Sequence, residues 1–265
     1  MHLSSRSLQP GTFLLRGMIW LFVGVIFALV FVLLTEFLRD VLPSPIHLLV
    51  ATVGAGSLTA LFYGSMRLTV IVANILFITT LAYVFSISYV DKVSLLPLIT
   101  GGALLGMVIG AYYGWKDKGS RIFCADAKIV AGVVAGSISA VIVVVPVWLI
   151  FGLEQTVYPW LVMAIAPVTG QLYVLSAYWF VERCQHLLSP VGDGAVVGLG
   201  VGAVTQLVFV IMASSLDSNI VGLAEPSPYL ERVKDVLVLS MLGAALSCFV
   251  LGMLRTAFRA RWYDL

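Results

Sequence analysis

The sequence predicts an all-α integral membrane protein, a polytopic bundle of about eight transmembrane helices. Three observations carry this prediction: long apolar runs, a shortage of charged residues, and glycines repeated every four residues within the apolar runs. Hydrophobic residues make up 61% of the 265 residues and charged residues only 11%, whereas soluble domains carry about 25% charged residues. So few charges cannot cover a surface exposed to water, and we expect most of the outer surface to face lipid.

Eight apolar runs are long enough to cross a hydrocarbon core of ~30 Å, which requires about 20 helical residues. They lie near 13–37, 46–64, 67–89, 94–115, 128–152, 159–181, 193–214 and 234–257. The first run is longer than the apolar core of a cleavable signal peptide, so we expect it to span. The connections are too short to fold alone, which predicts a single transmembrane domain over 1–265.

The basic residues predict the orientation of the chain, because short cytoplasmic loops are enriched in Lys and Arg. With the N-terminus inside and eight spans, 11 of the 15 Lys and Arg residues fall in cytoplasmic segments and 4 in outer segments. An odd number of spans would lose this asymmetry. We therefore expect both termini to be cytoplasmic, in an inner (plasma) membrane.

Glycine spacing predicts where the helices pack most closely. Residues four apart fall near one helix face, and a face without Cβ atoms lets another backbone approach. The expected packing positions are Gly102, Gly106, Gly110, Gly114, Gly132, Gly136, Gly194, Gly198 and Gly202, and the same spacing of small residues includes Gly56, Ala60, Gly64 and Ala140. The likeness of 102–110 to 243–252 is compatible with a four-plus-four repeat of the spans, but glycine-rich apolar helices resemble one another by composition alone, and we favour that explanation.

The sixth apolar run contains the main candidate binding site. Pro167 and Gly170 favour a broken helix near mid-membrane, and such breaks are tolerated where the freed backbone lines a cavity or a solute. The expected binding residues are Thr169, Gln171 and Tyr173 in this run and Gln206 in the next. A plain proline kink, with both glutamines hydrogen-bonded to neighbouring helices, is the alternative interpretation.

Other chemistries find less support in the sequence. No Asp, Glu, Lys, Arg or His falls in the middle third of any expected span, which disfavours a proton-driven pump. Cys124, Asp126, Cys184 and His186 are of the residue types that bind zinc, but their spacing matches no strong zinc signature. We expect no metal, no cofactor and no disulfide. The net charge of +2 and the lack of basic runs with aromatics argue against nucleic acid.

Two aspartates superficially resemble those of prepilin peptidases: Asp91, which precedes Leu95-Leu96-Pro97, and Asp126 in Asp126-Ala127-Lys128. The residues before Asp126 lack that family's glycine-rich turn. One span between the two aspartates would also place them on opposite membrane faces, where they could not form a catalytic pair. We therefore expect no enzyme.

Two functional classes remain open. The first is a permease for a small neutral or weakly charged solute, with its site at the sixth run. The second is a non-catalytic structural or assembly subunit of a larger membrane complex. Besides the bilayer, the expected partners are further copies of the chain, other membrane subunits, and a soluble protein or anionic lipid at the basic segment 116–128.

Overall fold

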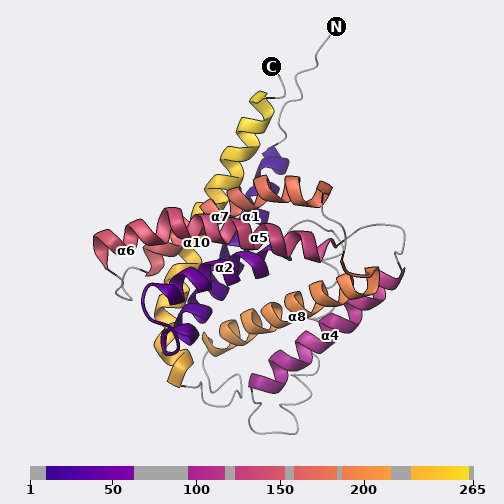
Figure 1. The fold of residues 1–265 in the computed structure, drawn as a ribbon, viewed down its shortest axis with the longest axis horizontal. Helices are drawn as coiled ribbons and strands as arrows, with labels where there is room; N and C mark the ends of the chain where they lie inside the picture. Colours follow the sequence, from indigo (N-terminus) through magenta and orange to yellow (C-terminus); the bar gives the residue numbers. More distant parts are fainter. Residues whose placement is uncertain are drawn as a thin grey trace. The chain divides into compact units, whose positions relative to one another are not determined.

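The computed structural model describes residues 10–62, 95–116, 123–152, 158–183, 187–215 and 228–262, and every regular element within them is a helix. The elements are α1 (Pro10–Arg39), α2 (Ile46–Ala60), α4 (Leu95–Lys116), α5 (Ala125–Ser139), η1 (Ala140–Val144), α6 (Val145–Phe151), α7 (Tyr158–Arg183), α8 (Pro190–Ser215) and α10 (Pro228–Trp262) (Figure 1). The all-α prediction is confirmed for this part of the chain.

Five helical stretches of the described chain are long and apolar enough to cross a membrane. They are Phe13–Arg39, Ala125–Phe151, Tyr158–Ala177, Pro190–Phe209 and Val236–Ala257, and Ile46–Ala60 is a shorter apolar helix. These helices indicate a multi-pass membrane protein. The expected span at 67–89 and the packing position Gly64 lie outside the described residues, so the number of eight spans stays a prediction.

The distribution of side chains by size supports a lipid-facing exterior. Large apolar residues are exposed on the helices, for example Leu149 at 70% and Trp160 at 73%. Many of the fully buried positions hold small residues, such as Ala51, Ala131 and Ala135. Exposed apolar side chains around a small-residue interior are the arrangement expected where close helix packing, rather than exclusion from water, holds helices together.

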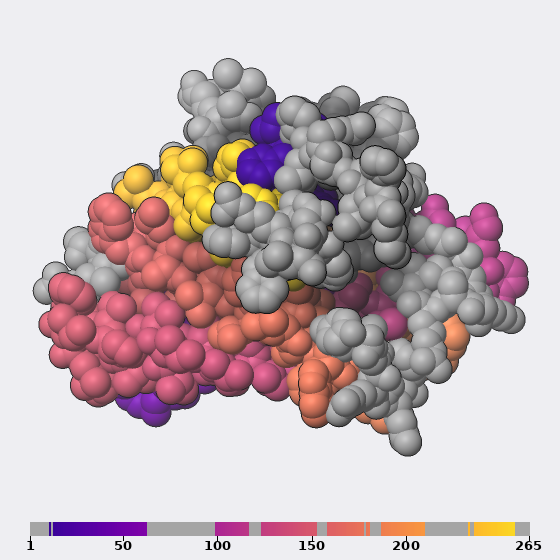
Figure 2. All heavy atoms as spheres, turned by 90° about the horizontal axis from the view of Figure 1, so that it is seen from above, coloured from indigo at the N-terminus to yellow at the C-terminus, as the bar shows by residue number. Residues whose placement is uncertain are grey.

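The described chain divides into two compact units, each of which is presented by itself. The first unit comprises 1–56, 135–174 and 235–265, and the second comprises 57–134 and 175–234. Within the first unit, the segments 140–151 and 158–174 both contribute to the molecular face drawn in Figure 2.

In the first unit, α1 and α10 run antiparallel in direct contact. A Cβ on Gly17 would meet Phe249, and a Cβ on Gly24 would lie 2.5 Å from the carbonyl oxygen of Ala244. A Cβ on Gly252 of α10 would in turn lie 2.7 Å from the Trp20 side chain. Helix α2 packs as tightly on α5, where a Cβ on Gly136 would lie 2.8 Å from the Cα of Val53.

In the second unit, α4 and α8 run antiparallel with their glycine faces together. A Cβ on Gly106 would lie 3.0 Å from the Cα of Gly202, and a Cβ on Gly110 would lie 3.0 Å from the Cα of Gly198. The nearest atoms are the carbonyl oxygens of Gly198 and Gly194, so the two backbones are in contact. At the two ends of this contact, Gly102 faces the side chain of Gln206 and Gly114 faces Pro190.

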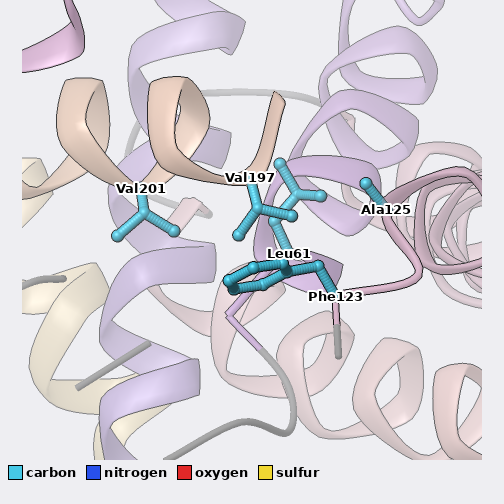
Figure 3. Packing of buried hydrophobic residues seen from close by; sticks show 5 residues of the cluster. All are labelled: Leu61, Phe123, Ala125, Val197 and Val201. Atoms are coloured by element: carbon cyan, nitrogen blue, oxygen red, sulfur yellow. The ribbon is translucent and has the colours of Figure 1, made fainter. Parts of the chain in front are cut away.

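A hydrophobic cluster lies beside this helix pair in the second unit. It consists of Leu61, Phe123, Ala125, Val197 and Val201, all buried (Figure 3). The half-buried side chains Ile109 and Tyr113 of α4 pack against it. The cluster therefore joins the end of α2, the start of α5 and the first half of α8.

Replacing Gly106 by Ala should destabilise the chain, because the new methyl group would meet the backbone of α8 with nothing flexible to move aside. We expect a loss of about 1–3 kcal/mol, the usual cost of overpacking. Gly101→Ala is the matched control, since a Cβ at Gly101 has nothing within 4 Å. Unfolding in detergent measures both variants. Equal stability of the two variants would contradict the backbone contact between α4 and α8.

Candidate functional site

Helix α7, which contains the predicted binding residues, is continuous. It runs from Tyr158 to Arg183 with Pro167 inside it. The prediction of a broken helix in this span is therefore wrong. Proline removes one backbone donor, which leaves the carbonyl of Met163 without its usual partner. A membrane helix tolerates this loss when neighbouring groups or a slight local adjustment compensate for it.

The irregular segment lies instead in the preceding span. Helix α5 continues into the π-helical segment Ala140–Val144, where the N–H of Val145 donates to the carbonyl of Ala140, and then into α6. Pro146 explains the widened turn: it has no N–H, and in an α-helix its ring would clash with the carbonyl of Ile142. Proline inside the apolar run 128–152 was the signal in the sequence that could have revealed this segment. Such π segments frequently occur at functional sites.

A buried pair of hydroxyls joins α5 to α7 just before the π segment. The Oγ of Ser139 and the Oγ1 of Thr169 lie 2.7 Å apart, and both side chains are buried. The Ser139 hydroxyl also donates to the carbonyl of Gly136 at 3.0 Å. A hydroxyl has only one proton, so both bonds form together when Thr169 donates to Ser139. The Thr169 oxygen then keeps its acceptor capacity. Sequence reasoning identified Thr169 and missed Ser139.

The four predicted binding residues do not converge on one point. Thr169 and Tyr173 are buried, and their spacing of four residues places them on the same face of α7. Gln171 is half-buried and lies two residues away from each, on the other side of the helix. Gln206 belongs to the second unit, where it is fully buried and packs against Gly102 of α4.

The predicted packing glycines within the described residues are all buried, Gly56 included, and Gly64 lies outside those residues. Gly102, Gly106, Gly110 and Gly114 lie against α8, while Gly194, Gly198 and Gly202 lie against α4. Gly136 lies against α2, and Gly132 is also buried.

A second polar arrangement lies where α5 and α8 begin, in the second unit. The Asp193 carboxylate of α8 accepts hydrogen bonds from the backbone N–H groups of Cys124 and Ala125, at 2.9 and 2.5 Å. Asp126 of α5 accepts from the N–H of Leu187, before α8, at 2.8 Å, and also from the N–H of Ala127 at 2.8 Å. Each helix thus supplies a carboxylate to the segment that begins the other, and we name this pair the carboxylate clasp.

The clasp replaces a local helix cap. Cys124 precedes α5 with a φ of 47°, a left-handed conformation that is uncommon outside glycine. The first amides of a helix lack partners within the helix, and here a distant carboxylate supplies them. Of the residue types suited to zinc near this point, Cys184 and His186 lie outside the described residues, as does Asp91 of the considered aspartate pair.

The pair Ser139 and Thr169 should show a measurable energetic coupling. In a double-mutant cycle of Ser139→Ala and Thr169→Val, we expect a coupling of about 0.6 kcal/mol, the mean for hydrogen bonds between membrane helices. Unfolding in detergent measures the two single variants and the double variant. Additive losses would mean that the two hydroxyls do not interact.

Removing the Asp193 carboxylate should loosen the beginning of α5. Asp193→Ala loses both acceptors and should cost about 1–2 kcal/mol, as for the loss of a helix cap, whereas Asp193→Asn keeps one acceptor oxygen and should cost less. Hydrogen exchange should accelerate at 124–127 in both variants. Asp40→Ala, at an exposed position after α1, serves as the control. Unchanged exchange in Asp193→Ala would exclude the clasp.

Comparison of the chain with protein-family models, with curated proteins and with solved structures found no match.

Proposed function

We propose that the chain is a permease of about eight spans that moves a small neutral or weakly charged solute across an inner (plasma) membrane. Both termini lie in the cytoplasm in this proposal. The bias of Lys and Arg toward one set of loops, 11 against 4, supports the orientation. The helix contacts support this arrangement of eight spans, in which α1, α4, α8 and α10 would be the first, fourth, seventh and eighth. An odd-numbered span and an even-numbered span cross the membrane in opposite directions. Both contacting pairs, α1 with α10 and α4 with α8, combine an odd-numbered with an even-numbered span, and both are antiparallel.

The four-plus-four repeat is supported by the sequence alone. Its two matched stretches have different partners: 102–110 pack on α8, whereas Gly243 faces Met163 of α7 and Ala244 lies against Gly24 of α1.

The transport proposal rests on the environment of Gln171. Its amide lies at the middle of α7, an apolar helix, and the side chain is only half-buried. Lipid tails cannot satisfy an amide, and an unsatisfied polar group at this depth is unfavourable. A hydrogen-bonding solute or the water of a pathway would satisfy it. Pro167, four residues earlier on the same helix, leaves the carbonyl of Met163 without its helical donor.

The buried hydroxyl pair holds this helix in place. Thr169 on the opposite face of α7 is joined to Ser139 of α5 at 2.7 Å, and Tyr173 is buried on the same side as Thr169. One side of α7 is thereby fixed to its neighbour, which leaves the side with Gln171 for a solute. Gln206, buried at the α4–α8 contact, acts in this proposal as a packing residue rather than as a ligand.

A subunit of a larger membrane complex is the second candidate, and Gln171 again favours it, because the amide of a partner helix would satisfy this side chain equally well. The glycine ladders no longer support this alternative, since those of α4 and α8 lie against each other within the chain. In this alternative, the basic segment 116–128 would dock a soluble partner or anionic lipid.

Gln171→Leu should abolish solute uptake and leave stability nearly unchanged. Proteoliposomes with wild-type or variant chain are incubated with a mixture of sugars, polyols, amides and amino acids, and mass spectrometry identifies what enters. Thr100→Val, at an exposed position of α4, is the control and should transport normally. Uptake by Gln171→Leu at the wild-type rate would exclude a solute contact at Gln171. Stoichiometric co-purification of other membrane proteins, with no uptake, would favour the subunit alternative.

A further inference from the structure

Lys128 is a buried cation in the second unit whose amine has no hydrogen-bond partner within the described part of the chain. It lies in the first turns of α5, and its side chain is 7% exposed. Helical side chains point back toward the N-terminus of their helix, and the Lys128 amine interacts electrostatically with Cys124 and Asp193 at that end. The amine is therefore directed to the place where α5 begins.

The nearby carboxylates do not supply the missing acceptor. Both oxygens of Asp193 accept from the amides of Cys124 and Ala125, and both oxygens of Asp126 accept from the amides of Leu187 and Ala127. Their negative charge lies on helix N-termini, whose partial positive charge offsets it. The three donors of the ammonium remain unsatisfied, and burying them in this state is strongly unfavourable. No described residue of the chain accepts them, which leaves them available to a bound acceptor.

The aromatic residues of α4 indicate the depth of this position in the membrane. Tyr112 and Trp115 are both exposed near the C-terminal end of α4, with their rings 6.3 Å apart. Exposed Trp and Tyr mark the membrane interface. Gly114 lies against Pro190, where α8 begins, and Asp193 is one turn further along α8. The clasp and Lys128 are thus at the level of the lipid headgroups, where phosphate groups are concentrated.

We propose that Lys128 binds a phosphate group at the N-terminal end of α5. A phosphate offers several acceptor oxygens to the three donors of one ammonium, and charge-assisted bonds of this kind are short and strong. The phosphate belongs to a phospholipid headgroup or to a small phosphorylated solute, and either would make the same contact with the Lys128 ammonium. This site is independent of the solute site proposed on α7.

In the experiment, one of three compounds is added to the wild-type chain purified in detergent: phosphatidylglycerol, a diacylglycerol with the same acyl chains, or inorganic phosphate. Native mass spectrometry measures bound lipid, and thermal unfolding measures the effect of each addition. Phosphatidylglycerol should bind and raise Tm where diacylglycerol does not. A rise with inorganic phosphate alone would identify a soluble phosphate as the source.

Lys128→Met should weaken phosphate binding by about tenfold or more, the effect of losing one charge-assisted hydrogen bond. The variant should fold, because the Lys128 amine makes no hydrogen bond to the described residues that the substitution could remove. Lys128→Arg keeps the charge and the donors and should retain binding. Arg16→Met, which removes an exposed basic residue near the start of α1, is the matched control and should bind as the wild type does.

Two results would overturn the proposal. The first is equal binding of phosphatidylglycerol by the wild type and by Lys128→Met. The second is a wild-type chain that responds to none of the phosphate probes, a result that needs no variant and therefore does not depend on whether Lys128→Met folds. Neither result bears on uptake through α7.

Discussion

The direct contact between the backbones of α4 and α8 is the constraint on which the second unit depends. Glycines on both helices leave no Cβ between them, so carbonyl oxygens of one helix lie against the Cα atoms of the other. In lipid, helices gain little from burying apolar side chains, and close packing of this kind holds them together. The approach of α8 to α4 brings Val197 and Val201 to the cluster with Phe123 and Ala125 (Figure 3).

The close packing of the helices determines which polar groups can come within hydrogen-bond distance of each other. Because Val197 and Val201 of α8 pack against Ala125, the Asp193 carboxylate one turn earlier on α8 can reach the first amides of α5. The buried ammonium of Lys128 lies one turn into α5. In the first unit, the hydroxyls of Ser139 and Thr169 likewise form a hydrogen bond between two helices that small residues already hold close. Packing decides which polar groups meet.

The sequence predicted the features that depend on local periodicity and could not predict those that depend on distant partners. Four-residue spacing identified which faces of α4 and α8 lack Cβ atoms, and those faces lie together in the structure. The contact of α1 with α10 was missed because Gly17 and Gly24 are seven residues apart and form no ladder. Asp193 caps a helix that begins 68 residues earlier, and no local pattern reveals such a partner. The two prolines show the same limit: α7 remains continuous at Pro167, while the chain widens into a π turn before Pro146.

The α4–α8 contact determines the distance between the two helices more strictly than it determines how far one helix is shifted along the other. Because the glycines recur every four residues, a shift of about 6 Å would bring each glycine to the place of the next and preserve most of the contact. Only the two ends distinguish one alignment from another: Gln206 fills the space beside Gly102, and Pro190 lies against Gly114. A glutamine at one end and a proline at the other thus act as stops on a surface that is otherwise nearly periodic.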